Sequence, residues 1–322
     1  MQKGRTTVLK IPVTILTGFL GSGKTTLLNR ILSEQHGQKL AVIVNEIGKI
    51  GIDHKLIVNV DEEIMEMTNG CLCCTVREDL LISLKQLLQA KRNNEAQFDG
   101  MVIETTGLAN PGPIIQTFFL DPVIQDAYEI NGIITVVDAF HIEKHFTKGL
   151  EAKEQLAFAD KILLNKTDLI VQEKQNELQA LLQSINPTAE IIPTVTCETN
   201  IKDLLRIQTF RTRDTLEIRP HYSEHLNDVT TFVLRETKLI DLHKFNEWMT
   251  AVVGELGEYL YRYKGILYVK QTDRRIVFQG VHTLFAASYD REWGEEKRVS
   301  EIVIIGKHLN REWFEEHFRN CT

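Results

Sequence analysis

The sequence of 322 residues contains little of what marks a secreted, membrane-spanning or disordered protein. Only 7 residues are proline, which argues against long disordered linkers. The five cysteines are odd in number and three of them crowd together at Cys71, Cys73 and Cys74, unlike the disulfide framework of a secreted domain. No segment reaches the roughly 18 uninterrupted apolar residues of a membrane span. We therefore expect a globular protein without membrane segments.

Positively charged residues are also fewer than negatively charged ones. Lysine and arginine number 37 against 44 aspartates and glutamates, which gives a formal net charge of −7. An extended basic surface for nucleic acid is therefore disfavoured. The basic and then apolar N-terminus resembles a signal peptide, but it runs into a glycine-rich segment at Gly18 with no small-residue cleavage site before it. Together with the cysteines, this predicts a cytoplasmic protein with no nucleic-acid or membrane partner.

The sequence does contain enough apolar residues, 43% of the total, for about two domains with sizeable cores. In the first two-thirds, short β-branched apolar runs alternate with amphipathic helical stretches. This alternation predicts an α/β fold, a doubly wound and mostly parallel sheet with helices on both faces. Ligands bind such sheets at the carboxyl ends of the strands. The expected strands cover residues 13–17, 40–45, 101–104, 132–138, 161–165 and 191–194.

The character of the sequence changes after about residue 205. A polar stretch of weak periodicity, residues 206–228, is predicted to link a first domain, residues 1–205, to a second, residues 229–322. The second domain is expected to be a smaller α+β unit with Trp248, Trp293 and Trp313 in its core. Its expected strands cover residues 229–235, 265–270, 275–280 and 301–305, and its helices cover residues 242–256 and 310–317, with Asn310 as a cap.

The segment from Gly18 to Thr25 matches the phosphate-binding pattern GxxxxGK[ST] between an expected strand and an expected helix, which predicts a P-loop NTPase. Glycines allow backbone N–H groups and the helix N-terminus to surround a phosphate. Lys24 is predicted to reach the β- and γ-phosphates, and the Thr25 hydroxyl to bind Mg²⁺. The alternative is a glycine-rich turn that matches by chance. The residues expected to line the nucleotide here are Gly18, Phe19, Leu20, Gly21, Ser22, Gly23, Lys24, Thr25 and Thr26.

A second nucleotide motif, Asn165-Lys166-Thr167-Asp168, ends a later expected strand. A carboxylate at Asp168 can accept from both the ring N–H and the exocyclic amine of guanine, a donor pair that adenine lacks. Asn165 would brace the loops, and Lys166 would pack its stem along the base. The alternative is a helix cap by Asp168 or Thr167. Because the motif follows a P-loop in an α/β chain, it favours GTP and GDP as ligands.

Glu104-Thr105-Thr106-Gly107 follows another apolar strand. Glu104 could hold Mg²⁺ through water and the Gly107 N–H could sense the γ-phosphate, so that residues 108–113 form a switch. Thr105 would lie beside the nucleotide. The alternative is a plain turn with Thr105 or Thr106 as a cap. Asp138, at the end of the next strand, is expected to cap or brace neighbouring loops.

Cys71, Cys73 and Cys74 place three thiols within four residues, just before a helix expected near Val76. Three thiolates can converge on one ion, and sulfur ligands favour Zn²⁺ or Cu(I). Structural zinc sites normally use four protein ligands and have no open position. Three ligands leave one position on the ion open, which suits transfer of the ion to another protein. A redox disulfide and inert buried thiols are the alternatives.

With CxCC between the P-loop and NKTD, the sequence resembles the CobW/HypB/UreG family of metallochaperone GTPases, closest to its CobW-like branch. The matching pieces are GFLGSGKTTLL, NEIG, NGCLCC, ETTGLANPGP, NKTD, RYKG and FQGV, in family order over nearly the whole length. The resemblance implies a GTPase domain, a CobW C-terminal domain, and slow GTP hydrolysis coupled to a transition metal, most often zinc in this branch. Where family members carry further acidic residues, this chain has Val44 and Lys49, so only Glu46 and the cysteines carry over as candidate metal ligands.

The leading hypothesis is a GTP-dependent chaperone or insertase that holds zinc at the three cysteines and passes it to a client metalloprotein. Nucleotide state would alter metal affinity, and the coupling must be reciprocal. Cobalt, nickel or iron as cargo stays open, as does a dimer that depends on metal or nucleotide. The rivals are a regulatory GTPase switch with structural or redox cysteines and a zinc-buffering protein with a vestigial nucleotide site. The sequence identifies neither the client nor a catalytic base, for which Glu46 and Glu104 are the only candidates.

Overall fold

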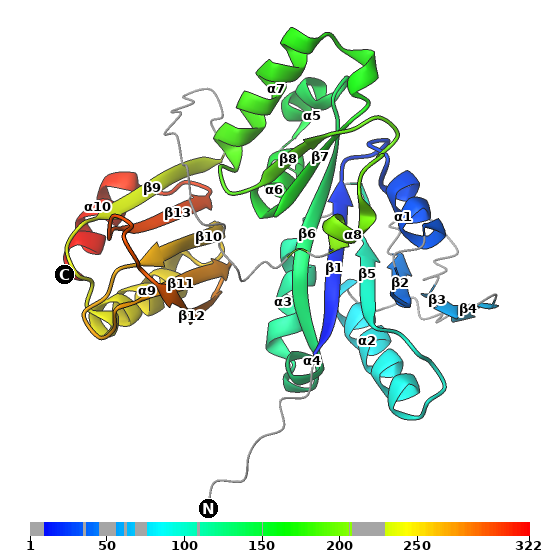
Figure 1. Ribbon diagram of the computed structural model, residues 1–322, viewed down its shortest axis with the longest axis horizontal. Helices are drawn as coiled ribbons and strands as arrows, with labels where there is room; N and C mark the ends of the chain where they lie inside the picture. Colours follow the sequence, from blue (N-terminus) through cyan, green and yellow to red (C-terminus); the bar gives the residue numbers. More distant parts are fainter. Residues whose placement is uncertain are drawn as a thin grey trace, which may run out of the picture.

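The structure is a computed structural model that describes residues 10–34, 37–44, 56–60, 63–67, 76–107, 110–149, 151–205, 207 and 229–322. These residues form two sheets, one of eight strands and one of five, each covered by helices (Figure 1). The α/β fold with a second, smaller α+β unit is therefore confirmed. No helix among the described residues combines the length and the apolar composition needed to cross a bilayer.

The larger sheet has the strand order β4-β3-β2-β5-β1-β6-β7-β8. Neighbouring strands pair in parallel except at the β4 edge, where β3 pairs antiparallel with both β2 and β4. The strands are β1 (Ile11–Gly18), β2 (Leu40–Val44), β3 (Leu56–Val60), β4 (Glu63–Met67), β5 (Gly100–Glu104), β6 (Tyr128–Asp138), β7 (Lys161–Asn165) and β8 (Glu190–Pro193). The six predicted strands are all present, whereas β3 and β4 were not expected.

Helices cover both faces of this sheet because its strands are apolar on both sides. In β1, Ile15 packs into the cluster beneath α2 and α3, and its neighbour Leu16 packs into the cluster beneath α1 and α8. The face of α1 (Lys24–Ser33) also carries α8 (Ile201–Leu205). The opposite face carries α2 (Val76–Arg92), α3 (Gly112–Leu120), α4 (Pro122–Ala127), α5 (Ile142–Lys148), α6 (Glu151–Phe158) and α7 (Gln172–Ile185).

The smaller sheet is antiparallel, with the order β12-β11-β10-β13-β9. Two capped helices cover one face: Asp241 accepts from the first N–H groups of α9, and Asn310 caps α10 as predicted. The elements are β9 (Thr230–Glu236), α9 (Leu242–Leu256), β10 (Leu260–Leu267), β11 (Arg274–Val281), β12 (Leu284–Glu292), β13 (Ser300–Gly306) and α10 (Arg311–Arg319). Trp293 is buried and Trp248 and Trp313 pack against this core, which confirms their predicted place.

The other face of the smaller sheet packs on the larger unit. Successive residues of β13 show this: Ile302 and Ile304 join the cluster of α9 and α10, whereas Val303 and Ile305 join the cluster that holds α2 and α3. The alternation is the two-residue period of a strand. The smaller sheet is therefore covered on both faces, on one by its own helices and on the other by the larger unit.

The smaller sheet differs from the prediction at two main places. Strand β12 was not expected, and β10 begins at Leu260, five residues before the predicted start at 265. The predicted linker, residues 206–228, lies outside the described residues except for Ile207. That residue is buried in the cluster of α1 and α8, so the core of the larger unit extends to it.

Candidate nucleotide-binding site

The candidate site lies where the carboxyl ends of the parallel strands meet. The strand register sets Leu16 of β1 beside Glu104 of β5, and Asp138 of β6 beside Asn165 of β7. Strand β1 lies between β5 and β6. The segments that follow the carboxyl ends of these neighbouring strands leave the sheet in different directions. This is the position at which doubly wound sheets bind ligands.

The loop from Gly18 to Gly23 is shaped to bind an anion. Gly23 has φ 112°, and a Cβ there would lie 2.6 Å from Nδ2 of Asn165. The first N–H groups of α1, which follow at once, have no acceptor within the helix and carry the positive end of its dipole. The Ser22 hydroxyl is buried and has no hydrogen-bond partner among the described residues. These donors fit the oxygens of a phosphate.

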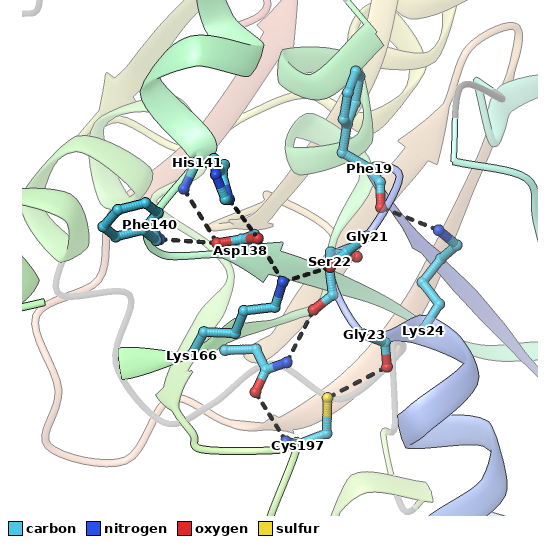
Figure 2. A network of polar contacts seen from close by, with 11 residues as sticks. Phe19, Gly21, Ser22, Gly23, Lys24, Asp138, Phe140, His141, Lys166 and Cys197 are labelled. Carbon is cyan, nitrogen blue, oxygen red and sulfur yellow. Dashed lines mark hydrogen bonds and ion pairs between the residues drawn. The ribbon is translucent and has the colours of Figure 1, made fainter. Parts of the chain in front are cut away.

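Lys24 points back along this loop (Figure 2). Its Nζ donates to the carbonyl of Gly18 at 2.7 Å and to that of Phe19 at 3.1 Å. The side chain is 8% exposed. Burial lowers the pKa of Lys24, while the Glu104 carboxylate acts in the opposite direction. The ammonium group thus lies inside the loop, where a phosphate would meet it.

The two residues predicted to bind Mg²⁺ are brought together. Thr25 is exposed in the first turn of α1, and its hydroxyl donates to Oε1 of the buried Glu104 at 3.2 Å. A hydroxyl and a carboxylate are oxygen ligands of the kind that Mg²⁺ prefers, so the residues present fit this ion. Behind them, the Thr105 hydroxyl donates to that of Thr17 at 3.0 Å, which fixes the start of the loop after β5.

Asn165 ties three loops together. Its Nδ2 donates to the carbonyl of Ser22 at 2.9 Å, and its Oδ1 accepts from the backbone N–H of Cys197 at 2.9 Å and from the Thr194 hydroxyl at 3.3 Å. Asn165 is itself buried. The loop after β8 and the phosphate loop are therefore held at a fixed distance, the bracing role that the sequence predicted for Asn165.

Lys166 and Asp138 form the other side of the site (Figure 2). Lys166 has φ 63°, and its Nζ donates to the carbonyl of Gly21 and to Oδ2 of Asp138, each at 2.7 Å. Asp138 also accepts from the N–H groups of Phe140 and His141, so it braces its loop as predicted. Burial alone would raise the pKa of Asp138, but bonds from Lys166 and His141 hold it below its ordinary value.

The remaining residues predicted to contact the nucleotide differ in exposure and in hydrogen bonding. Asp168 lies in an exposed single turn, η1 (Thr167–Leu169), and has no hydrogen bond or ion pair with the described residues. Thr26 and Leu20 are exposed and Phe19 is half-buried. Thr167 does not cap a helix with its side chain, because its hydroxyl donates to the carbonyl of Thr194 at 3.1 Å.

Cys197 is a buried thiol, as expected. Its side chain is fully buried, and its Sγ lies 3.4 Å from the carbonyl of Gly23. Burial raises the pKa of this thiol to about 11. The thiol therefore stays protonated at neutral pH and is a poor metal ligand.

Nothing in the sequence pointed to Gln155, a residue that contacts the loop after β5. Gln155 of α6 is buried and donates from Nε2 to the carbonyl of Gly107 at 3.3 Å. The Thr106 hydroxyl is buried without a hydrogen-bond partner among the described residues. Gly107 itself lies against the phosphate loop, since a Cβ there would be 2.6 Å from the backbone nitrogen of Leu20.

The predicted transition-metal ligands, Cys71, Cys73, Cys74 and Glu46, lie outside the described residues. Within the residues that are described, no group of three or more histidine, cysteine, aspartate or glutamate side chains is placed to hold a metal ion. The CxCC site therefore stays a prediction.

Known proteins resemble the chain over nearly its whole length. The model of the CobW/HypB/UreG nucleotide-binding domain matches residues 12–193, and that of the cobalamin synthesis protein cobW C-terminal domain matches residues 229–322. The zinc chaperone YjiA of Escherichia coli is 39% identical over 306 residues, covering 94% of this chain and 96% of YjiA. Zinc-regulated GTPase metalloprotein activator 1 of Schizosaccharomyces pombe is 32% identical over 347 residues, covering 94% and 83%. The crystal structure of the Zn(II)-bound YjiA GTPase from E. coli matches with a TM-score of 0.80 at 37% identity, covering 98% of this chain and 100% of that one.

Proposed function

Because the chain belongs to the CobW/HypB/UreG family, we propose that it is a GTP-hydrolysing metallochaperone that binds zinc at Cys71, Cys73 and Cys74 and transfers it to a client metalloprotein. The observation that carries the nucleotide part is the pairing of Thr25 with Glu104 beside the buried Lys24. The metal part is supported by the CxCC sequence and by relatives named as a zinc chaperone and a zinc-regulated GTPase. The nucleotide site is assigned to a domain of residues 1–205, joined by residues 206–228 to a domain of residues 229–322.

The phosphates bind at the start of α1. The free N–H groups of the first turn and the Ser22 hydroxyl donate to phosphate oxygens. When the nucleotide binds, the ammonium group of Lys24 leaves the carbonyls of Gly18 and Phe19 and donates to the β- and γ-phosphates instead. Since Glu104 already opposes the effect of burial on the pKa of Lys24, the added negative charge of the phosphates keeps the ammonium group protonated.

Thr25 and Glu104 would hold Mg²⁺, which neutralises phosphate charge when it is bound. The loop after β5 would contact the γ-phosphate. Gly107 lies against Leu20 of the phosphate loop, so its N–H group is available to the γ-phosphate that distinguishes GTP from GDP. The position of this loop therefore reports which nucleotide is bound.

Guanine is selected by Asp168, whose exposed carboxylate accepts from the ring N–H and the exocyclic amine of the base. Thr105, Asn165 and Lys166 fix the loops around the nucleotide. We expect Asp168→Ala to weaken GTP binding by about tenfold to a hundredfold, the loss of a bond between a charged and a neutral group. Glu173→Ala, which removes an exposed carboxylate at the start of α7, is the matched control. Equal affinity of both variants for GTP would contradict this role for Asp168.

Coupling to the metal is tested by measuring GTP turnover of reduced, metal-free protein during a Zn²⁺ titration at fixed Mg²⁺, together with direct metal counting. We expect about one tight zinc ion per chain and a change in turnover when it binds, because a coupling between two sites acts in both directions. Titration with Co²⁺, Ni²⁺ and Fe²⁺ in the same assay compares the alternative cargoes, and size-exclusion chromatography with zinc and GTP detects a dimer.

Two cysteine variants make the test specific. Cys73→Ala should lose the tight zinc ion and the effect of zinc on turnover. Cys321→Ala, at a buried thiol of the smaller sheet's core, should keep both. If Cys73→Ala retains both, the cysteines are not the cargo site. If the wild type neither binds tight zinc nor responds to it, a GTPase switch without metal cargo replaces this proposal.

A further inference from the structure

Glu154 of α6 lies between the nucleotide site and the smaller sheet and uses both carboxylate oxygens. Its Oε2 accepts from Nδ2 of Asn110 at 3.0 Å, and its Oε1 accepts from the hydroxyl of Tyr261 at 2.7 Å. Asn110 belongs to the loop after β5, three residues beyond Gly107. Tyr261 belongs to β10 of the smaller sheet. One half-buried side chain thus connects two units that are far apart in sequence.

The side of α6 that faces the nucleotide holds the loop at two points. Gln155, the residue after Glu154, donates to the carbonyl of Gly107 at 3.3 Å. The Asn110 side chain is oriented by a second bond, because its Oδ1 accepts from the N–H of Gly112 at 2.7 Å. The backbone carbonyl of Gln155 in turn accepts from the hydroxyl of Thr135 in β6 at 2.9 Å. Helix α6 is therefore fixed on the sheet while two successive side chains reach the loop.

The other side of α6 is held by β10. Tyr261 is 3% exposed, and its ring centroid lies 5.7 Å from that of Phe158 at the end of α6. Arg262, the next residue, donates to the carbonyl of Phe158 at 2.5 Å and pairs with Asp160. The docking of the smaller sheet therefore determines where the Tyr261 hydroxyl meets Glu154.

We propose that Glu154 is a positioning residue for GTP hydrolysis, which holds the loop of Gly107 and Asn110 in its working position and does so only with the Tyr261 hydroxyl in place. The inference rests on the proposed role of that loop at the γ-phosphate. It gives the smaller sheet a part in hydrolysis, because Tyr261 orients the carboxylate that holds Asn110. Because GDP lacks the γ-phosphate, its affinity does not depend on the linkage from Tyr261 through Glu154 to Asn110. Breaking this linkage therefore lowers kcat for GTP.

The test is a double-mutant cycle of Glu154→Gln and Tyr261→Phe, with kcat and KM for GTP and the dissociation constant for GDP measured on the full chain. Both changes keep the shape of the side chain. Each single variant should lower kcat roughly tenfold to a hundredfold, the value of one hydrogen bond to a charged group, with GDP affinity within about twofold of wild type. The double variant should be no slower than the slower single variant, because both changes break one linkage.

The control is Tyr263→Phe, which removes a hydroxyl of the same strand that donates to the carbonyl of His282 at 3.1 Å. Its kcat should stay within about twofold of wild type. The inference is overturned if Tyr261→Phe turns over GTP at the wild-type rate, if the two effects multiply, or if Tyr263→Phe is equally slow. A wild-type chain that binds GTP without hydrolysing it would instead overturn the proposed function, so the two failures are distinguishable.

Discussion

Replacing Arg262 by methionine is expected to lower the free energy of unfolding by about 3–5 kcal/mol, the cost of removing one partner from a buried ion pair. The Arg262 side chain is 4% exposed and that of Asp160 is 6% exposed. Asp160 also accepts from the N–H of Ile133 through its other oxygen at 3.0 Å. Methionine fills part of the space of Arg262 but removes the charge that neutralises Asp160 at the contact between the two sheets.

A second variant separates charge from packing. Asp160→Asn in the Arg262→Met background replaces the carboxylate by a neutral amide whose oxygen still accepts from Ile133. We expect it to restore about 1–3 kcal/mol of the loss, because no charge then remains at the buried contact. Arg298→Met is the control, since its partner Asp273 is 89% exposed and such pairs contribute less than about 1 kcal/mol.

The assay uses the placement of the tryptophans. All 3 of them, Trp248, Trp293 and Trp313, lie in or against the core of the smaller sheet, so their fluorescence during urea unfolding reports that unit. Far-UV circular dichroism reports both units in the same titration. The reasoning is refuted if Arg262→Met loses less than about 1 kcal/mol, or if the added Asp160→Asn change makes the protein less stable still.

Three further predictions concern buried polar groups. Asn186→Ala should cost about 2–3 kcal/mol in urea unfolding, because the fully buried amide donates to three carbonyls around the end of α6; a loss below about 1 kcal/mol would contradict it. Burial lowers the pKa of His282 from 6.5, so its contribution to stability is present above pH 6.5 and is lost as the pH falls through the folded-state value. Wild type should therefore lose stability more steeply below pH 6.5 than His282→Gln, by up to about 1.4 kcal/mol per pH unit, and equal slopes would exclude this. Burial raises the pKa of both Cys197 and Cys321 to about 11, so mass spectrometry should find these thiols unalkylated by iodoacetamide in the folded protein at pH 8 and alkylated after unfolding; modification of either in the folded protein would count against it.

Elements whose ends carry their own chemical signals could be predicted from the sequence. Helix α9 covers Leu242–Leu256 as expected, because Asp241 caps its first turn and a regular apolar face follows. Strand β7 covers Lys161–Asn165 as expected, since three buried apolar residues lie between a charged residue and the start of a motif. The meeting of Thr25, Glu104 and Asn165 at one edge also follows from parallel strands, whose carboxyl ends lie together.

Other features depend on partners that are distant in sequence. Among the described strands, β12 pairs with β11 alone and lies at the sheet edge, where Tyr289 is 61% exposed, so its sequence lacks the apolar pattern of a buried strand. The start of β10 was missed because Arg262 interrupts the apolar run. Its burial depends on Asp160, which is 102 residues away. Glu154 and Gln155 look like ordinary helix residues, and their contacts with the loop after β5 are 44 and 48 residues distant.

The position of α6 explains why the smaller sheet belongs to the support of the nucleotide site. A helix of 8 residues has little stability of its own, so tertiary contacts determine where it lies. Those contacts come from Thr135 beneath it, from Asn186 around its end, and from Tyr261 and Arg262 of the smaller sheet. A shift of β10 therefore displaces the helix that carries Glu154 and Gln155. Since those two side chains hold the loop of Gly107, the docking of the smaller sheet and the geometry at the γ-phosphate are expected to change together.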